Sequence, residues 1–136
     1  MIDYTFWRLP FLLHITIESA AVFLFTCRPE SQLSTKECSV EARLVLRQYG
    51  ALLASSNLIC LGTILQPYSS SLTRQIALAL VVYHVFPCHR AWFRLQAGHE
   101  GKKGAGERRV PFLARPDLHL VLHVACCAAF AAVGIF

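Results

Sequence analysis

The chain has 136 residues, of which 55% are hydrophobic and 15% charged, and its mean hydropathy is +0.48. This composition is too apolar for an ordinary soluble domain, because so few charged side chains could not cover a water-facing surface. The net charge of +5 does not indicate a nucleic-acid partner, since the basic residues lie between apolar segments and are not interleaved with exposed aromatic residues.

The first apolar segment, residues 9–27, is as long as a helix needs to be to cross a bilayer. Trp7 and other aromatic residues precede it, as in an interfacial belt, and Pro29 follows its end. A cleavable signal peptide is not favoured, because Asp3 precedes the run, Glu18 interrupts it and no small-x-small cleavage site follows. We therefore expect this segment to remain in the mature protein.

The second helix is predicted to begin near Thr35 and to end near Leu65, with its membrane portion in residues 45–65. Ser34 and Glu37 have the spacing of a capping box, which favours a helix start there. A helix of this length exceeds the bilayer thickness, so its charged first part is expected to lie outside the hydrocarbon.

The third predicted span is residues 72–93, in which His84 is the only ionisable residue of a long apolar run and Pro87 is expected to cause a kink. Glycines and charges then dominate residues 95–115, which we predict to be a mobile basic connection. The fourth span is residues 117–136, preceded by a proline that suits a helix start.

These segments predict an all-α integral membrane four-helix bundle, with residues 1–136 forming a single four-span domain. Of the thirteen Lys and Arg residues, only Arg8 and Arg74 lie outside the first and third connections. The positive-inside tendency therefore places residues 28–47 and 90–116 in the cytosol and both termini in a lumenal or extracellular space.

The six cysteines show neither a C-x-x-C pair nor the regular spacing of a disulfide framework, so we expect them to be mostly free. Zinc binding by these thiols is less favoured on the same ground. Three of them lie inside apolar segments, where cysteine behaves as a small hydrophobic residue, and the other three are expected to face the cytosol. The first group is Cys60, Cys126 and Cys127; the second is Cys27, Cys38 and Cys88.

Each predicted span carries a polar residue whose burial in hydrocarbon needs an explanation. Glu18, Asn57 and His84 are expected near the middle of the bilayer, with His123 about one turn to the cytosolic side. An ionisable side chain at such a depth costs about 2.5–3.5 kcal/mol on insertion scales, so it normally has a partner or a function. One interpretation is that these groups form hydrogen bonds between helices and fix their packing.

The alternative is that Glu18, His84 and His123 form the floor of a cavity for a lipophilic ligand and are the candidate catalytic residues. Asn57 and Arg47 complete the candidate ligand-binding set, although snorkelling of Arg47 to lipid phosphates is the favoured interpretation of that residue.

Metal binding is a sharper alternative, in which imidazole and carboxylate side chains bind iron, copper or haem. Its candidates are His14 and His119, together with Glu18, His84 and His123. We predict no metal site, because H-x-x-x-[HE] pairs arise easily and His14 and His119 are expected in opposite leaflets. The sequence assigns no cofactor.

One pattern in the chain resembles a known family. It consists of Glu18 in the first span, the stretch Glu41–Gly50 opening the second, Tyr83-His84, and Pro87-x-x-Arg90-Ala91 closing the third. In these features the chain is similar to small four-helix proteins of the DoxX-like type, including uncharacterised fungal members. The resemblance implies a four-helix membrane bundle but no transferable catalytic residue.

The favoured function is that of an accessory or lipophilic-ligand-binding protein of the endoplasmic reticulum or another internal membrane. The alternatives are a membrane-embedded enzyme of the isomerase, hydratase or oxygenase type, and a subunit of a small transporter or channel. The expected partners are the lipid bilayer, a membrane protein or a second copy of the chain, and a lipophilic small molecule, with no nucleic acid.

Overall fold

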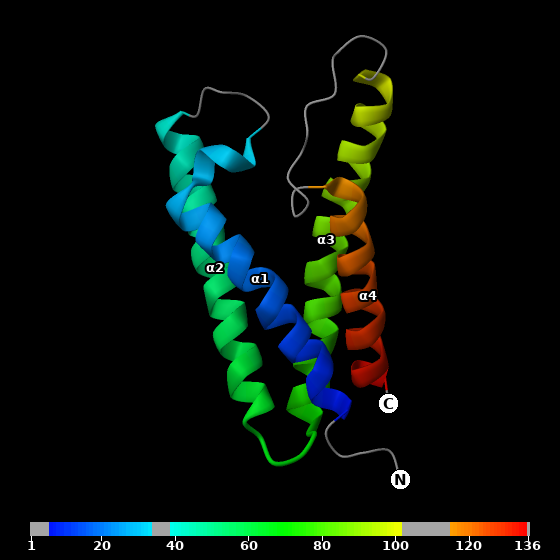
Figure 1. Cartoon of the computed structure of the whole chain (residues 1–136). Coiled ribbons are helices and arrows are strands. Elements are labelled where there is room, and N and C mark those ends of the chain that lie inside the picture. Colours follow the sequence, from blue (N-terminus) through cyan, green and yellow to red (C-terminus); the bar gives the residue numbers. More distant parts are fainter. Residues whose placement is uncertain (1–5, 34–38, 102–114, 136) are drawn as a thin grey trace. The chain divides into compact units, whose positions relative to one another are not determined.

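The computed structural model describes residues 6–33, 39–101 and 115–135 (Figure 1). The four α-helices are α1 (Leu9–Cys27), α2 (Val40–Ile64), α3 (Ser71–Gly101) and α4 (Pro116–Ile135), and the short 3-10 turns are η1 (Phe6–Arg8) and η2 (Pro29–Gln32). Each α-helix is long and apolar enough to cross a membrane. The predicted all-α four-helix membrane fold is confirmed, and the chain is a multi-pass integral membrane protein.

The helices form two compact antiparallel pairs. The first pair, α1 with α2, lies within Met1–Tyr68, and the second, α3 with α4, lies within Ser69–Phe136. The members of each pair lie side by side along most of their length (Figure 1). Each pair therefore presents an interhelical interface of its own, and each interface buries polar residues.

The helix boundaries agree with the prediction for α1 and differ for α2. The helix α2 begins at Val40, because the Ser39 hydroxyl accepts a hydrogen bond of 3.1 Å from the Ala42 amide and so caps the first turn. The predicted start near Thr35 and the capping box of Ser34 and Glu37 lie outside the described residues.

The helix α3 is longer than predicted. Its start is fixed by Ser70 and Thr73, each of which accepts a hydrogen bond of 3.2 Å from the other's backbone amide through its hydroxyl oxygen. The helix continues through Pro87 to Gly101, so the predicted connection of residues 95–115 begins inside a helix. Residues 102–114, the remainder of that connection before Arg115, lie outside the described part of the chain.

The first pair is closest at Gly50. A Cβ atom at this position would lie 2.8 Å from Thr26 Cγ2 and 3.1 Å from Phe25 Cβ, so only glycine allows α1 and α2 to approach as they do. Beside this contact the Phe25 and Tyr49 rings meet edge to face at 4.9 Å, and Leu53 is buried one turn further along α2.

The second pair is closest at Gly134, where a Cβ atom would lie 2.6 Å from Leu78 Cδ2. Small side chains line much of the interface, and the aromatic ring of Phe130 fills the space between them. Its fully or nearly fully buried members are Ala77, Leu80, Ala91, Cys126 and Phe130. Small residues favour helix association in lipid because they allow close packing. Van der Waals contacts, rather than the hydrophobic effect, hold such helices together.

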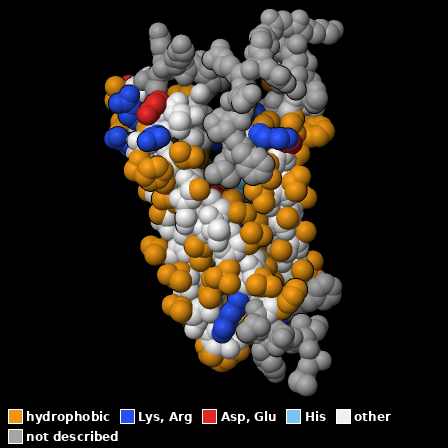
Figure 2. Space-filling model, in the orientation of Figure 1, with side chains coloured by type: hydrophobic (Ala, Val, Ile, Leu, Met, Phe, Trp, Pro, Cys, Tyr) orange, Lys and Arg blue, Asp and Glu red, His pale blue; other side chains and the backbone are white. Residues whose placement is uncertain are grey.

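The outer surface of the helices is apolar. Large hydrophobic side chains cover the face seen in Figure 2, whereas the visible Lys and Arg side chains lie towards the helix ends. Leu52, Leu58, Val82 and Phe86 are each more than half exposed, as is Val121 on α4. Such a surface is unfavourable in water but matches the hydrocarbon of a bilayer.

Candidate functional site

Both helix pairs bury polar residues, and the first group comes from α1 and α2. We call it the hydroxyl–amide cluster; its members are the buried His14 and Glu18, the half-buried Ser56 and Asn57, and the exposed Ser19. His14 is fully buried, and its Nε2 atom lies 3.1 Å from Ser56 Oγ. The Ser56 hydroxyl donates in turn to the Leu53 carbonyl at 2.8 Å, so the hydroxyl oxygen accepts from His14 and the imidazole proton belongs on Nε2.

A second contact between α1 and α2 joins Asn57 to Ser19. The Asn57 amide donates from Nδ2 to Ser19 Oγ at 3.3 Å. The other end of the amide, Oδ1, is buried, and none of the described residues donates a hydrogen bond to it. A buried amide oxygen in this state has free capacity to accept a hydrogen bond from a bound molecule.

Glu18 lies next to Ser19 on α1. Its side chain is 3% exposed, and its carboxyl group lies near enough to the buried thiol of Cys60 for the two to interact electrostatically. Asn57 and Cys60 are three residues apart and share a face of α2. The carboxyl group and the thiol therefore lie near each other between α1 and α2, and the Asn57 amide lies on the same face of α2 as the thiol.

The second group of buried polar residues comes from α3 and α4. His84 and His123 are at most 2% exposed, and their Nδ1 atoms are 2.7 Å apart. One Nδ1 must carry the shared proton and the other must accept it, so the two rings are never both fully protonated in this arrangement. The Phe130 ring stacks on His84 with a centroid distance of 5.6 Å.

The second helix pair also contains two thiols. The side chain of Cys88 interacts with that of Cys127, and Cys127 donates a weak hydrogen bond of 3.7 Å to the Val81 carbonyl. Both cysteines are free and half-buried. We call His84, Cys88, His123 and Cys127 the His–Cys cluster.

The structure brings some of the predicted site residues together within the pairs. His84 meets His123 directly, although counting depth along each span placed them about one turn apart. Glu18 is adjacent in the chain to Ser19, which accepts the hydrogen bond of Asn57 in the first pair. The single cavity predicted from Glu18, His84 and His123, and their catalytic role, stay predictions.

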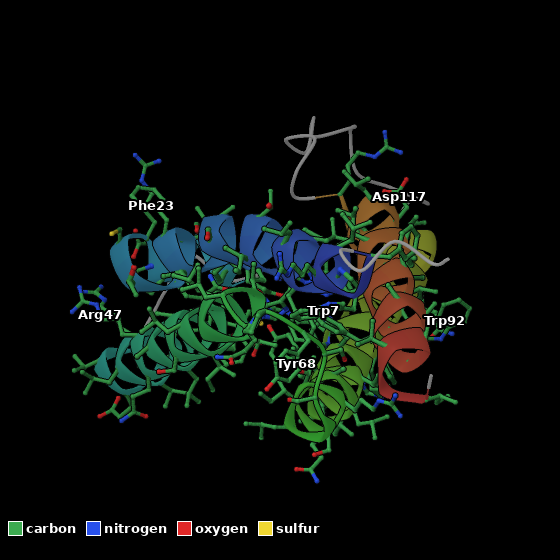
Figure 3. All side chains as sticks on the ribbon, turned by 90° about the horizontal axis from the view of Figure 1, so that it is seen from below. Trp7, Phe23, Arg47, Tyr68, Trp92 and Asp117 are labelled. Atoms are coloured by element: carbon green, nitrogen blue, oxygen red, sulfur yellow. The ribbon has the colours of Figure 1, made fainter. Side chains whose placement is uncertain are left out.

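The remaining candidates have separate surroundings. His14 bonds to Ser56 in the first pair, whereas the His119 ring contacts that of His123 edge to face at 4.2 Å in the second. Arg47 is exposed and lies at the outer end of the first helix pair (Figure 3).

The charged start of α4 is also exposed. The Arg115 side chain donates a hydrogen bond of 3.1 Å from Nε to Asp117 Oδ1, and its Nη2 atom donates a second to Asp117 Oδ2. The hydrogen bonds that Arg115 donates to Asp117 raise the pKa of the guanidinium above its ordinary value. Figure 3 shows Asp117 at the start of α4.

Four residues of the two clusters were not among the predicted site residues. Ser19 and Ser56 carry no signal in a single sequence, because serine is common in membrane helices. Cys88 was expected to face the cytosol, but it lies within the third span and contacts Cys127. A signal was present in the spacing, since a histidine precedes each of these cysteines by four residues.

No protein-family model, curated protein or solved structure matches the chain. The similarity to DoxX-like proteins stays a prediction, and function has to be inferred from the residues themselves.

Proposed function

We propose that this protein binds a lipophilic small molecule that carries a hydrogen-bond donor, such as an alcohol or an amine, as an accessory protein of an internal membrane. The observation that supports it most is Glu18, a carboxyl side chain that is 3% exposed on a helix able to cross a membrane. Such a residue costs several kcal/mol in hydrocarbon and is retained where it serves a ligand, an ion or a proton path.

The neighbours of Glu18 favour a ligand with a donor group. The carboxylate and the Asn57 amide oxygen are both acceptors, and the amide oxygen has no donor among the described residues. A hydroxyl or amine on an apolar molecule could satisfy the amide oxygen and pair with the carboxylate, while its hydrocarbon part remains in the lipid phase.

Helix packing alone would not require Glu18. The bonds from His14 to Ser56 and from Asn57 to Ser19 already connect α1 with α2, and neither uses a carboxylate. Hydrogen bonds of this kind contribute about 0.6 kcal/mol each in membrane proteins, less than the cost of placing an acid in hydrocarbon.

The test is to purify the full chain in mild detergent and to identify the small molecules that accompany it by mass spectrometry. We expect one apolar alcohol or amine at close to one molecule per chain. In Glu18→Gln its amount should fall about tenfold, the effect of losing one charge-assisted hydrogen bond.

Thr16→Val is the matched control for this substitution. Thr16 lies on the same helix, is exposed, and bonds only to its own backbone at Leu12. Its replacement should leave the bound molecule unchanged. The proposal would be wrong if no molecule recurs between preparations, or if Glu18→Gln retains as much of it as Thr16→Val.

A further inference from the structure

Two hydrogen-bond donors without acceptors lie at the beginning of α1. Trp7 and Arg8 belong to η1, directly before the first residue of α1 (Figure 3). The Nε1 atom of Trp7 and the Nε atom of Arg8 are both buried, and no residue in the described part of the chain accepts a hydrogen bond from either. Buried N–H groups are nearly always paired, so two unpaired ones in adjacent residues indicate an acceptor from another molecule.

The two side chains form one site because they contact each other. The Arg8 guanidinium lies over the Trp7 ring, with its central carbon 5.1 Å from the ring centroid. Its Nη2 atom donates to the Gln66 carbonyl at 2.6 Å, and a guanidinium has further N–H groups beyond this one. The fully buried Phe11 meets the Trp7 ring edge to face at 6.2 Å and so helps to orient the indole.

The charge of this site favours an anion. Neither η1 nor the first turn of α1 contains an acidic residue that could neutralise Arg8. The beginning of a helix also carries a positive partial charge from its dipole. A phosphate group satisfies both the charge and the unpaired donors, because it is an anion with several strong acceptor oxygens. Phospholipids present this group at the level where a membrane span begins.

We propose that Trp7 and Arg8 bind the phosphate group of one membrane phospholipid. The guanidinium pairs with two phosphate oxygens through its fork of N–H groups, and the indole N–H donates to a third oxygen. The Arg8 side chain is half-buried, so it turns on its flexible stem to present Nε to the lipid. The inference does not depend on the proposed ligand of Glu18, because that ligand supplies a donor whereas this site needs an acceptor.

The test compares three probes on the full-length chain, purified in mild detergent and washed free of lipid. Dioctanoyl phosphatidic acid carries a phosphate on two short acyl chains, dioctanoylglycerol has the same chains without phosphate, and inorganic phosphate has no chains. Native mass spectrometry counts the bound molecules. We expect one phosphatidic acid per chain, and binding of the other two probes at least tenfold weaker, the effect of losing one charge-assisted hydrogen bond.

Substitutions of the two residues separate the contribution of charge from that of the indole. Arg8→Gln should weaken the binding of phosphatidic acid about a hundredfold, because it removes the charge and the paired hydrogen bonds. Trp7→Phe keeps an aromatic ring against Phe11 and removes only the indole N–H, so it should weaken binding about tenfold. Circular dichroism of Trp7→Phe should match the wild type, which excludes misfolding as the cause.

Arg74→Gln is the matched control. Arg74 is the other basic residue outside the first and third connections, and it is exposed on α3. Its replacement removes the same charge and should leave the binding of phosphatidic acid unchanged. An equal loss in Arg74→Gln and Arg8→Gln would overturn the proposal, because net charge alone would then attract the lipid. Equal binding of dioctanoylglycerol or inorganic phosphate, or full binding in Trp7→Phe, would overturn it as well.

Discussion

The two helix pairs bury polar residues of different chemistry. In α1–α2 the interhelical bonds run from His14 and Asn57 to serine hydroxyls. In α3–α4 the buried imidazoles of His84 and His123 contact each other, and the half-buried thiols of Cys88 and Cys127 interact. The first arrangement is typical of helix association in lipid, whereas the second places two ionisable rings in direct contact.

This difference suggests that a lipophilic donor should act on the first pair, through Glu18, and should leave the second pair unchanged. The following predictions are ordered by the size of the expected effect, and the outcome of each would weaken or strengthen the distinction between the two helix pairs.

Gly50→Leu should separate α1 from α2. Its first side-chain atom would overlap Thr26, and overpacking of this kind costs about 1–3 kcal/mol. Unfolding in mixed micelles can be followed through the fluorescence of Trp7, which contacts Phe11 in the first pair, in a Trp92→Phe background.

The control for Gly50→Leu lies on the same helix. A Cβ atom at Gly62 meets nothing within 4 Å, so Gly62→Leu should change stability by less than about 0.5 kcal/mol. Equal losses in the two variants would show that leucine disturbs α2 itself and that Gly50 is not a special contact.

The hydrogen bond between His14 and Ser56 should contribute little. A double-mutant cycle with His14→Leu and Ser56→Ala should give a coupling energy of about 0.6 kcal/mol, the average for interhelical bonds in a membrane protein. A coupling several times larger would mean that the first pair also depends on a strong polar centre.

Arg47→Gln should have the smallest effect. The side chain is exposed at the outer end of the first pair, so we expect a change of less than about 0.5 kcal/mol in the same unfolding measurement and no loss of any bound molecule (Figure 3). Loss of the molecule would restore Arg47 to the ligand-binding set predicted from sequence.

The sequence predicts the spans well because hydrophobic length and helix-breaking residues are local properties. The bounds of α1 agree with the prediction to the residue, while the start of α2 depends on which of several serines caps the helix. Ser39 does so in the structure, and composition cannot distinguish it from Ser34. The extension of α3 to Gly101 shows that glycines and charges do not end a helix by themselves.

The polar clusters are harder to predict, because they depend on how each helix is rotated and on its register with its partner. Nothing local distinguishes a His84 that faces His123 from one that faces another helix. The recurrence of histidine and cysteine four residues apart on α3 and α4 could have indicated the His–Cys cluster, but the antiparallel packing was needed to show that the two faces meet.

Arg8 has a consequence for how the first pair is anchored in the bilayer. Its guanidinium donates to the Gln66 carbonyl at 2.6 Å, just beyond the end of α2, and lies 5.1 Å from the Trp7 ring. One cation thus joins the beginning of one span to the end of the next and satisfies a carbonyl that lipid could not. A cation and an indole both prefer the headgroup layer, so this contact fixes the depth of both helices in the bilayer. Neither helix can then shift along the membrane normal without the other.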